Sequence, residues 1–231
     1  MALSRGLTDV TKKQRSEIIS TCAPVKLGLG LGLIGTEELA RMNLITTDFS
    51  SRMIAPPKRD GIAVADDIEF ASRDCDLGKV LVARSSFGIC AILLGSSIEE
   101  LEQSLAASFP YSRRAFNERE LNRYLSRVAQ FIAAPGGELD FKLDIRGTPF
   151  QRSVWHALRT VPFGKTLTYA QLACRVSGPK SLRAIAQACA ENSIALAIPC
   201  HRVMGHSGSM AAYRWGAERK RTLINREVAA A

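Results

Sequence analysis

Residues 194–203 read IALAIPCHRV, and this is the most unusual stretch of the chain. An apolar run leads directly into Pro199, Cys200, His201 and Arg202, which places a thiol beside two basic side chains. A thiolate is a far better nucleophile than a thiol, and nearby cationic groups lower the pKa of a cysteine. The stretch therefore predicts an activated Cys200, helped by His201, by Arg202 or by a helix N-terminus aimed at the sulfur.

Three other interpretations of Cys200 compete with an activated nucleophile. Cysteines are usually buried and only pack, and we predict that role for the other five, Cys22, Cys75, Cys90, Cys174 and Cys189. A zinc site is disfavoured because adjacent residues seldom share a metal and no second ligand pair stands at zinc spacing. A cysteine protease needs a base that faces the sulfur. The only other histidines are His156, in a helix beside Trp155, and His206, in a Gly/Ser loop.

The residues on either side predict a helical segment from residue 147 to residue 231. Thr148 and Pro149 begin a helix as N-cap and first residue, and its apolar face is Phe150, Val154, Trp155 and Leu158. Thr168 caps a second helix that ends near residue 176. Residues 177–180 form a Gly/Pro turn into a third helix over 181–190, whose buried face is Leu182, Ile185, Ala186 and Cys189. Two short helices joined by such a turn indicate a helix-turn-helix.

Residues 62–146 predict a small α+β domain. Strands are expected at 68–72, 79–84, 87–94 and 141–145, with hairpin residues Ser85, Ser86 and Gly88 between the second and third. Helices are expected at 97–109, with Ser97 as N-cap, and at 118–133. Residues 1–61 are predicted to be a tail and linker, with a short helix beginning at Thr36 and linker residues at 55–61.

The charge is distributed unevenly along a chain with a formal net charge of +9. Residues 151–231 hold 12 Lys or Arg against 3 Asp or Glu, whereas residues 1–150 hold 19 of each kind. A basic segment attached to a neutral one is typical of a polyanion-binding module, although a solvated basic surface explains the charge equally well. The lack of a C-x-x-C pair and of a signal peptide favours the cytoplasm. The apolar run at 27–35 is too short to span a membrane.

Residues from 68 to 227 resemble the O-alkylated-DNA–protein-cysteine alkyltransferases, most closely the carboxy-terminal half of the bacterial Ada type. The motifs that carry the resemblance are GTPFQ at 147–151, TYAQLA at 168–173, RAIAQACAEN at 183–192, IPCHRV at 198–203 and YRWG at 213–216. Arg219, Lys220 and Glu227 complete the set, and residues 77–84 and 88–95 are also similar. No cysteine cluster is present that could form the zinc-bound sensor of full Ada.

The resemblance implies a fold and a reaction. The fold would be α+β, with a ribonuclease-H-like antiparallel sheet domain at 62–146 followed by a winged helix-turn-helix domain at 147–231. The reaction would be the irreversible transfer of a methyl group from 6-O-methylguanine, and secondarily 4-O-methylthymine, to Cys200, which consumes the protein. The implied partner is the minor groove of alkylated double-stranded DNA, bound by a monomer. No cofactor and no metal are implied.

The resemblance also assigns residues. Cys200 matches the alkyl acceptor, His201 the base that deprotonates it through a water, and Glu227 the carboxylate that orients the histidine. Asn192 matches the brace of the active-site turn. Tyr169 matches the tyrosine at the 3′ phosphate, which also protonates the departing guanine. Arg183 matches the finger that fills the stack after base flipping. The other residues implied to contact DNA are Lys180, Ser181, Ala184 and Gln187, and those implied to line the alkyl pocket are Pro199, Val203, Ala211, Ala212, Tyr213 and Arg214.

This chain departs from the family pattern at one place, where Ala211-Ala212 replaces Ser-Gly before the YRWG motif. These residues are expected to border the alkyl pocket, so the change narrows the pocket or removes a hydrogen bond. Arg202 is interpreted as structural or phosphate-facing. Two rival functions use the helix-turn-helix without the chemistry, namely a non-catalytic protein that recognises alkylated DNA and a transcriptional regulator. The presence of Cys200 argues against the first.

Overall fold

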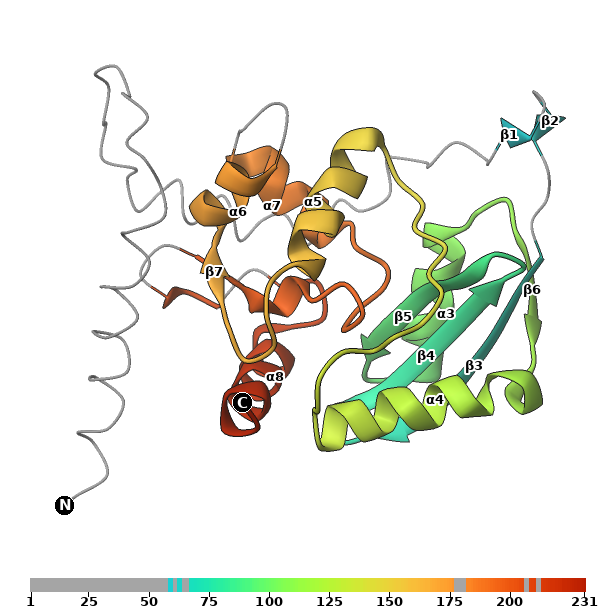
Figure 1. Ribbon diagram of the computed structural model, residues 1–231. Helices are drawn as coiled ribbons and strands as arrows, with labels where there is room; N and C mark the ends of the chain where they lie inside the picture. Colours follow the sequence, from blue (N-terminus) through green and yellow to red (C-terminus); the bar gives the residue numbers. More distant parts are fainter. Residues whose placement is uncertain (1–57, 60–61, 64–66, 177–181, 206–207, 211–212) are drawn as a thin grey trace. The chain divides into compact units, whose positions relative to one another are not determined.

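The computed structural model describes residues 58–59, 62–63, 67–176, 182–205, 208–210 and 213–231 (Figure 1). All of them belong to one compact unit, Ala40–Ala231. Several predictions fall outside the described residues: the short helix at Thr36, the turn at 177–180, and the positions Lys180, Ser181, His206, Ala211 and Ala212. β1 (Lys58–Arg59), in the predicted linker, pairs with β2 (Ile62–Ala63), just after it, as a small antiparallel ladder.

Three antiparallel strands follow one another along the chain, as predicted: β3 (Asp67–Cys75), β4 (Gly78–Ser85) and β5 (Gly88–Gly95). Residues 80–83 of β4 and 89–95 of β5 are buried at every position. Because successive strand side chains point to opposite faces, both faces of the sheet are covered there. Gly88 has φ 149° and lies so close to the Lys142 carbonyl that a Cβ would meet it at 2.3 Å, which explains the glycine at the hairpin.

The fourth strand corrects the prediction of an antiparallel sheet. β6 (Arg113–Phe116) pairs with β3 in parallel, so the sheet is mixed with the order β5-β4-β3-β6. The chain leaves β5, crosses the sheet through α3 (Ile98–Ser108) and therefore enters β6 in the same direction as β3. All four β6 residues are exposed, so the alternation of buried and exposed positions that identifies a strand in a sequence is missing.

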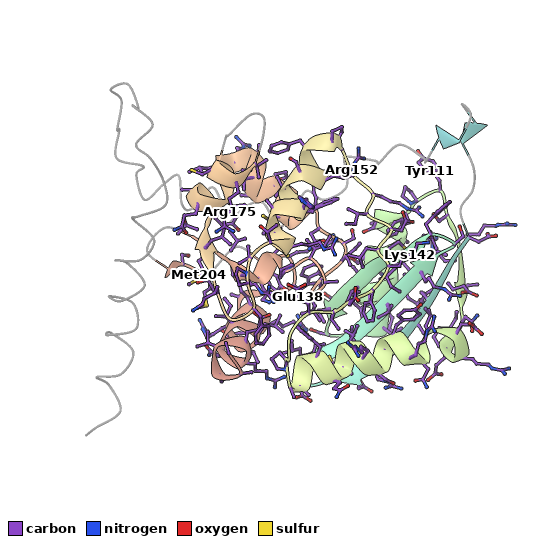
Figure 2. The ribbon with its side chains drawn as sticks, viewed as in Figure 1. Tyr111, Glu138, Lys142, Arg152, Arg175 and Met204 are labelled. Atoms are coloured by element: carbon purple, nitrogen blue, oxygen red, sulfur yellow. The ribbon has the colours of Figure 1, made fainter. Side chains whose placement is uncertain are left out.

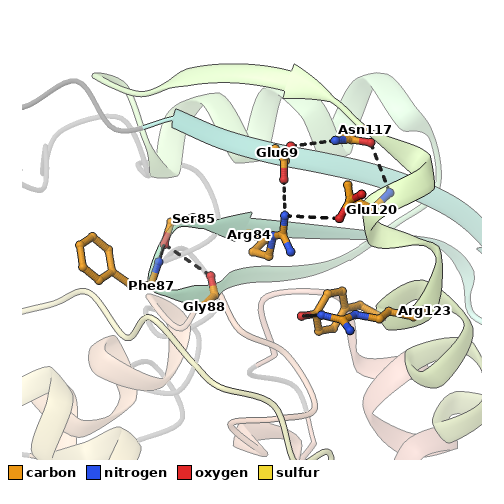
Figure 3. A network of polar contacts seen from close by, with 9 residues as sticks. Glu69, Arg84, Ser85, Phe87, Gly88, Asn117, Glu120 and Arg123 are labelled. Atoms are coloured by element: carbon orange, nitrogen blue, oxygen red, sulfur yellow. Dashed lines mark hydrogen bonds and ion pairs between the residues drawn. The ribbon is translucent and has the colours of Figure 1, made fainter.

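Helices α3 and α4 (Glu118–Ala133) pack against this sheet and begin at side-chain caps. Ser97 caps α3, as predicted, by accepting from the Glu100 N–H. Asn117 caps α4 by accepting from the Glu120 N–H, and its amide also donates to Glu69 on β3 at 2.7 Å (Figure 3). Glu69 accepts in turn from Arg84 on β4, so one polar network joins two strands to the start of α4.

The outer edge of β5 is covered by two short extended segments. The Ile89 N–H donates to Lys142 O and the Asp144 N–H donates to Ile89 O, both at 2.8 Å. Residues 141–145 thus form one parallel bridge and not the full strand predicted from the sequence, because the next part of the β5 edge is already occupied. There the Ile92 N–H donates to Ser193 O and the Ala195 N–H donates to Ile92 O, both at 2.9 Å.

The carboxy-terminal segment is helical, as predicted. It contains α5 (Pro149–Arg159), α6 (Tyr169–Arg175), α7 (Leu182–Ala190) and α8 (Ala217–Ala229). Thr148 and Thr168 each form a capping box, with Gln151 and Gln171 respectively. The Trp155 indole donates to Ala188 O at 2.8 Å and so ties α5 to α7. The two-residue strands β7 (Leu167–Thr168) and β8 (Val203–Met204) pair in parallel.

Candidate active site

The segment that precedes Cys200 folds into a strained turn. Leu196 is buried and has φ 68°, in the left-handed region that residues other than glycine seldom adopt. The turn is closed by the Ile198 N–H, which donates to Ile194 O at 3.0 Å, and by the Cys200 N–H, which donates to Ile198 O at 2.8 Å. Cys200–Arg202 then form a single 3-10 turn after Pro199. Such strain persists only where the surroundings hold it in place.

Asn192 holds this turn from inside. Its side-chain amide donates to Ile198 O at 2.9 Å and to the Cys200 Sγ at 3.3 Å, and its side-chain oxygen accepts from the Ile194 N–H at 2.9 Å. The Asn192 side chain is almost fully buried, so these bonds satisfy polar groups that would otherwise be costly. Asn192 therefore fixes the turn and the sulfur together.

The Cys200 thiol is only 5% exposed. Burial raises its pKa, and this outweighs the opposing effects of the Asn192 amide and of the positive charges on Lys220 and Arg214. Of the groups considered for activating the thiol, Arg202 is engaged elsewhere, because its guanidinium is bound to the carboxylate of Glu227. The resting side chain is thus a protonated thiol at neutral pH, which needs a base to become a nucleophile.

Glu227 forms a buried triad with His201 and Arg202, the two residues that follow Cys200. Glu227 on α8 accepts from His201 Nε2 at 2.8 Å and from Arg202 Nε and Nη2 at 2.8 and 3.0 Å. Burial by itself would raise the pKa of Glu227, but the hydrogen bonds from His201 and Arg202 outweigh it and lower the pKa to about 2. Arg202 also donates to Val161 O at 2.7 Å. Arg202 is therefore a structural residue in this fold, and it faces inward.

His201 is a neutral base in this setting. Burial lowers its pKa, so the ring carries no net charge at neutral pH. Since ionised Glu227 can only accept, the hydrogen-bond network assigns the ring proton to Nε2 and leaves Nδ1 as the basic nitrogen. Among the described residues, the buried Nδ1 has no hydrogen-bond partner. A thiol proton delivered to this nitrogen would find a ready acceptor.

Two tyrosines lie close to the sulfur. The β7–β8 pairing places Tyr169, the first residue of α6, beside the chain that leaves Cys200. Tyr169 is half-buried, and its pKa is raised by burial and then by the nearby thiols Cys189 and Cys200. Tyr213 is buried with its ring edge-on to Trp215, and its hydroxyl has no hydrogen-bond partner within the described part of the chain. Pro199 and Val203, also expected in the pocket, are buried.

The sequence assigned no role to Lys220, and it assigned Arg214 only to the pocket. Lys220 on α8 is fully buried, and burial lowers its pKa while Cys200 and Cys189 raise it. The signal that could have found it is helical spacing, because Lys220, Leu223, Ile224 and Glu227 share one face of α8 and all are buried. Two charged residues on an apolar helix face indicate a buried polar site.

Three of the residues expected to contact DNA, Arg183, Ala184 and Gln187, lie on α7, whereas Tyr169 begins α6 and Lys180 and Ser181 fall outside the described residues. Arg183 is exposed, whereas Ala184 and Gln187 are half-buried. The Gln187 amide donates to Glu191 at 2.6 Å, so it is held within the helix end. Arg152 on α5 and Arg175 on α6 are also exposed (Figure 2) and add positive charge to the same helical segment. Leu182, expected on the buried face of α7, is 45% exposed.

In the described part of the chain, no three His, Cys, Asp or Glu side chains gather closely enough to hold a metal ion. Within the same residues, no helix combines the length and apolar character that a membrane span requires. Of the remaining cysteines, Cys90 and Cys189 are buried as predicted, but Cys174 is exposed and does not pack in the core.

Comparison with known proteins finds the same relatives by sequence and by structure. Residues 149–229 match the family model described as 6-O-methylguanine DNA methyltransferase, DNA binding domain. The chain is 44% identical over 160 residues to the bifunctional transcriptional activator/DNA repair enzyme Ada of Escherichia coli, an alignment that covers 69% of this chain. It spans only 45% of that relative, less than half its length.

Two shorter relatives are covered over most of their length. The methylated-DNA–protein-cysteine methyltransferase of Kluyveromyces lactis is 32% identical over 163 residues, which cover 65% of this chain and 86% of the relative. The crystal structure of Mycobacterium tuberculosis OGT in complex with DNA superposes with a TM-score of 0.59 at 28% identity, covering 71% of this chain and 94% of OGT.

Proposed function

Because the chain belongs to the methylated-DNA–protein-cysteine methyltransferase family, we propose that it repairs DNA by moving a methyl group from 6-O-methylguanine onto its own Cys200. 4-O-methylthymine is the proposed secondary substrate. The observation that carries the proposal is the buried arrangement of Cys200, His201 and Glu227, with the Asn192 amide on the sulfur. This is the nucleophile, base and orienting carboxylate that transfer to a thiol requires.

The chemistry follows from the charges of the site. The proton of the Cys200 thiol passes through a water to Nδ1 of His201, and Glu227 stabilises the imidazolium that forms. The thiolate attacks the methyl carbon, so that a sulfur–carbon bond forms as the carbon–oxygen bond of the lesion breaks. The guanine leaves with the electron pair and takes a proton from the Tyr169 hydroxyl. The product is a thioether that ordinary hydrolysis does not reverse, so each molecule acts once. The thiolate attacks the lesion directly, so the proposed reaction needs no cofactor.

The proposed DNA complex uses α6 and α7 as a winged helix-turn-helix on the minor groove. Arg183 is exposed at the start of α7, where its side chain can fill the stack left by a flipped base. Sequence-independent phosphate contacts suit a protein that must survey all DNA. We assign this work and the chemistry to residues 147–231, and a ribonuclease-H-like scaffold role to residues 62–146. The protein is proposed to act as a monomer in the cytoplasm.

A single-turnover assay tests the proposal. A duplex that carries one 6-O-methylguanine with a radiolabelled methyl group is mixed in molar excess with the protein, and the label is followed from DNA to protein. We expect transfer that stops at one methyl group per protein molecule and is absent from Cys200→Ser. Tight binding of the duplex with the label retained on DNA would instead support the non-catalytic or regulatory alternative, and repeated turnover would reject self-transfer.

A further inference from the structure

Arg214 joins the active-site turn to the amino-terminal half of the fold. Its Nη1 donates to Asn192 O at 3.3 Å and to Ser193 Oγ at 3.5 Å. Its Nη2 donates to Ser104 Oγ at 3.0 Å and to Ser108 Oγ at 3.3 Å, both on α3. One planar guanidinium therefore contacts two parts of the chain, Asn192–Ser193 and α3, that lie far apart in sequence.

On the α3 side, this contact requires Arg214 to act as the hydrogen-bond donor. Ser104 and Ser108 are one helical turn apart and so present their hydroxyls on the same face of α3. The Ser108 hydroxyl donates its own proton to Ser104 O at 2.8 Å. Its oxygen is therefore left to accept, and the guanidinium supplies the proton. Arg214 also lies over the Trp215 ring, with 5.7 Å from the guanidinium carbon to the ring centroid.

The other side of the contact reaches the residue that holds the sulfur. Arg214 binds the backbone oxygen of Asn192, whose side chain donates to Cys200 Sγ. The next residues, Ser193 and Ala195, are paired with Ile92 at the edge of β5. The Asn192–Ser193 peptide is thus held between β5 and α3, and Arg214 provides the link to α3.

We propose that Arg214 is a positioning residue whose guanidinium fixes the Asn192 peptide against α3 and so keeps the Asn192 amide on the Cys200 sulfur. The role in catalysis rests on the proposed methyl transfer, but the positioning of the thiol does not. Burial lowers the pKa of Arg214 to about 10, so the side chain keeps its charge and all its donors at neutral pH. Lysine keeps the charge but lacks the planar fork that spans both sides.

Arg219 provides a matched control. It also joins the two halves of the fold, donating to Leu77 O at 2.8 Å and to Ser96 Oγ at 3.0 Å. Its third contact is Trp215 O at 2.9 Å, and these three hydrogen bonds all lie away from the turn at 192–200. Arg219→Gln therefore removes an arginine of the same kind and should lower stability without moving the sulfur.

The test measures the pH dependence of Cys200 alkylation by iodoacetamide, resolved by peptide so that the exposed Cys174 is not counted, together with the methyl-transfer rate. The thiol is surrounded by ionisable groups on the 3-10 turn, α6, α7, α8 and the YRWG segment, namely His201, Arg202, Tyr169, Cys189, Lys220, Glu227 and Tyr213. Because all of them remain in every variant, a change in the pH midpoint reports the position of the Asn192 amide and the Arg214 charge.

We expect Arg214→Gln to raise the pH midpoint of Cys200 alkylation by about one unit and to slow methyl transfer about tenfold or more. The double variant Ser104→Ala/Ser108→Ala should shift both in the same direction while leaving the guanidinium in place. Arg214→Lys should restore the rate only in part.

Three results would overturn the inference: an unchanged pH midpoint in Arg214→Gln, an equal shift in Arg219→Gln, or full rescue by Arg214→Lys, which would mean that charge alone suffices. A wild-type protein that transfers no methyl group would reject the proposed function. If the pH midpoint still moved both in Arg214→Gln and in Ser104→Ala/Ser108→Ala, which keeps the Arg214 charge, the positioning of the thiol by Arg214 would stand.

Discussion

At the scale of single residues, the site combines a thiol that burial makes less acidic with neighbours that favour its anion. Cys200 is held by the Asn192 amide, and His201 is held neutral beside ionised Glu227. A buried thiolate gains more from one fixed donor than an exposed one would, because water cannot replace the hydrogen bond. The reactivity proposed for Cys200 therefore depends on these partners more than on its sequence neighbour Arg202.

Removing the Asn192 donor should slow the reaction. In Asn192→Ala the Cys200 sulfur loses its hydrogen bond, and the turn at Ile194 and Ile198 loses its internal brace. A hydrogen bond to a charged group is worth roughly 1.5–3 kcal/mol, so methyl transfer should slow by about ten- to a hundredfold. Single-turnover rates at saturating DNA measure this. A wild-type rate in a folded Asn192→Ala variant would contradict the role.

The triad also predicts how stability depends on pH. Glu227 has a folded-state pKa of about 2 against an ordinary 4.5, so the stability it contributes is present above pH 4.5 and is lost as the pH falls towards 2. His201, whose pKa is lowered from 6.5, adds a loss that begins as the pH falls below 6.5. Glu227→Gln should be less stable at pH 7 and show a flatter acid limb, measured by urea unfolding between pH 3 and 7. Parallel curves for the two proteins would refute this assignment.

At the scale of elements, the sequence predicted the helix starts and turns, which depend on residues that are neighbours in the chain. Three helices begin at the N-caps that the sequence predicted, Ser97, Thr148 and Thr168. Gly88 lies in a turn that has no room for a side chain. Contacts between distant segments were missed. The parallel strand β6 and the pairing of Ile92 with residues 193–195 depend on where the chain returns, which periodicity does not encode.

The candidate site could likewise be predicted only in part, because some of its contacts join segments that are distant in sequence. The activated Cys200 with His201 beside it was predicted from residues 194–203, and Glu227 came from the family resemblance, but the buried Lys220 and the link from Arg214 to α3 require the folded chain. Leu182 shows the limit of the hydrophobic pattern, since it has helical spacing with Ile185 and Cys189 and yet is exposed. An apolar residue at the end of a helix can lie beyond the core that its spacing suggests.

A prediction at this scale concerns the start of α7. Arg183 is exposed there, and none of the hydrogen bonds between described residues joins it to the Cys200 site. If its side chain replaces the flipped base, Arg183→Ala should slow repair of duplex DNA strongly and leave the reaction with free 6-O-methylguanine nearly unchanged. Lys165→Ala, which removes an exposed cation outside the helix-turn-helix, is the control. Equal slowing on duplex and free base would reject base flipping by Arg183.

At the scale of the whole molecule, the uneven charge predicts how binding responds to salt. Residues 151–231 carry the entire net charge of +9, and Arg152 and Arg175 stand exposed on their helices (Figure 2). The logarithm of the affinity for undamaged duplex should fall linearly with the logarithm of the salt concentration, because protein binding releases the cations that are condensed on DNA. Arg152→Gln should reduce that slope by about one if it contacts a phosphate. A slope near zero for the wild type would contradict an electrostatic DNA interface.

The central claim is that Cys200 itself becomes the methyl acceptor. The most direct measurement incubates the protein with an oligonucleotide duplex that contains 6-O-methylguanine, digests the protein and maps the modified peptide by mass spectrometry. We expect one added methyl group, on the peptide that contains Cys200, and none in Cys200→Ala. A methyl group found on another residue such as Cys174 or Cys189, or one retained after Cys200→Ala, would contradict it.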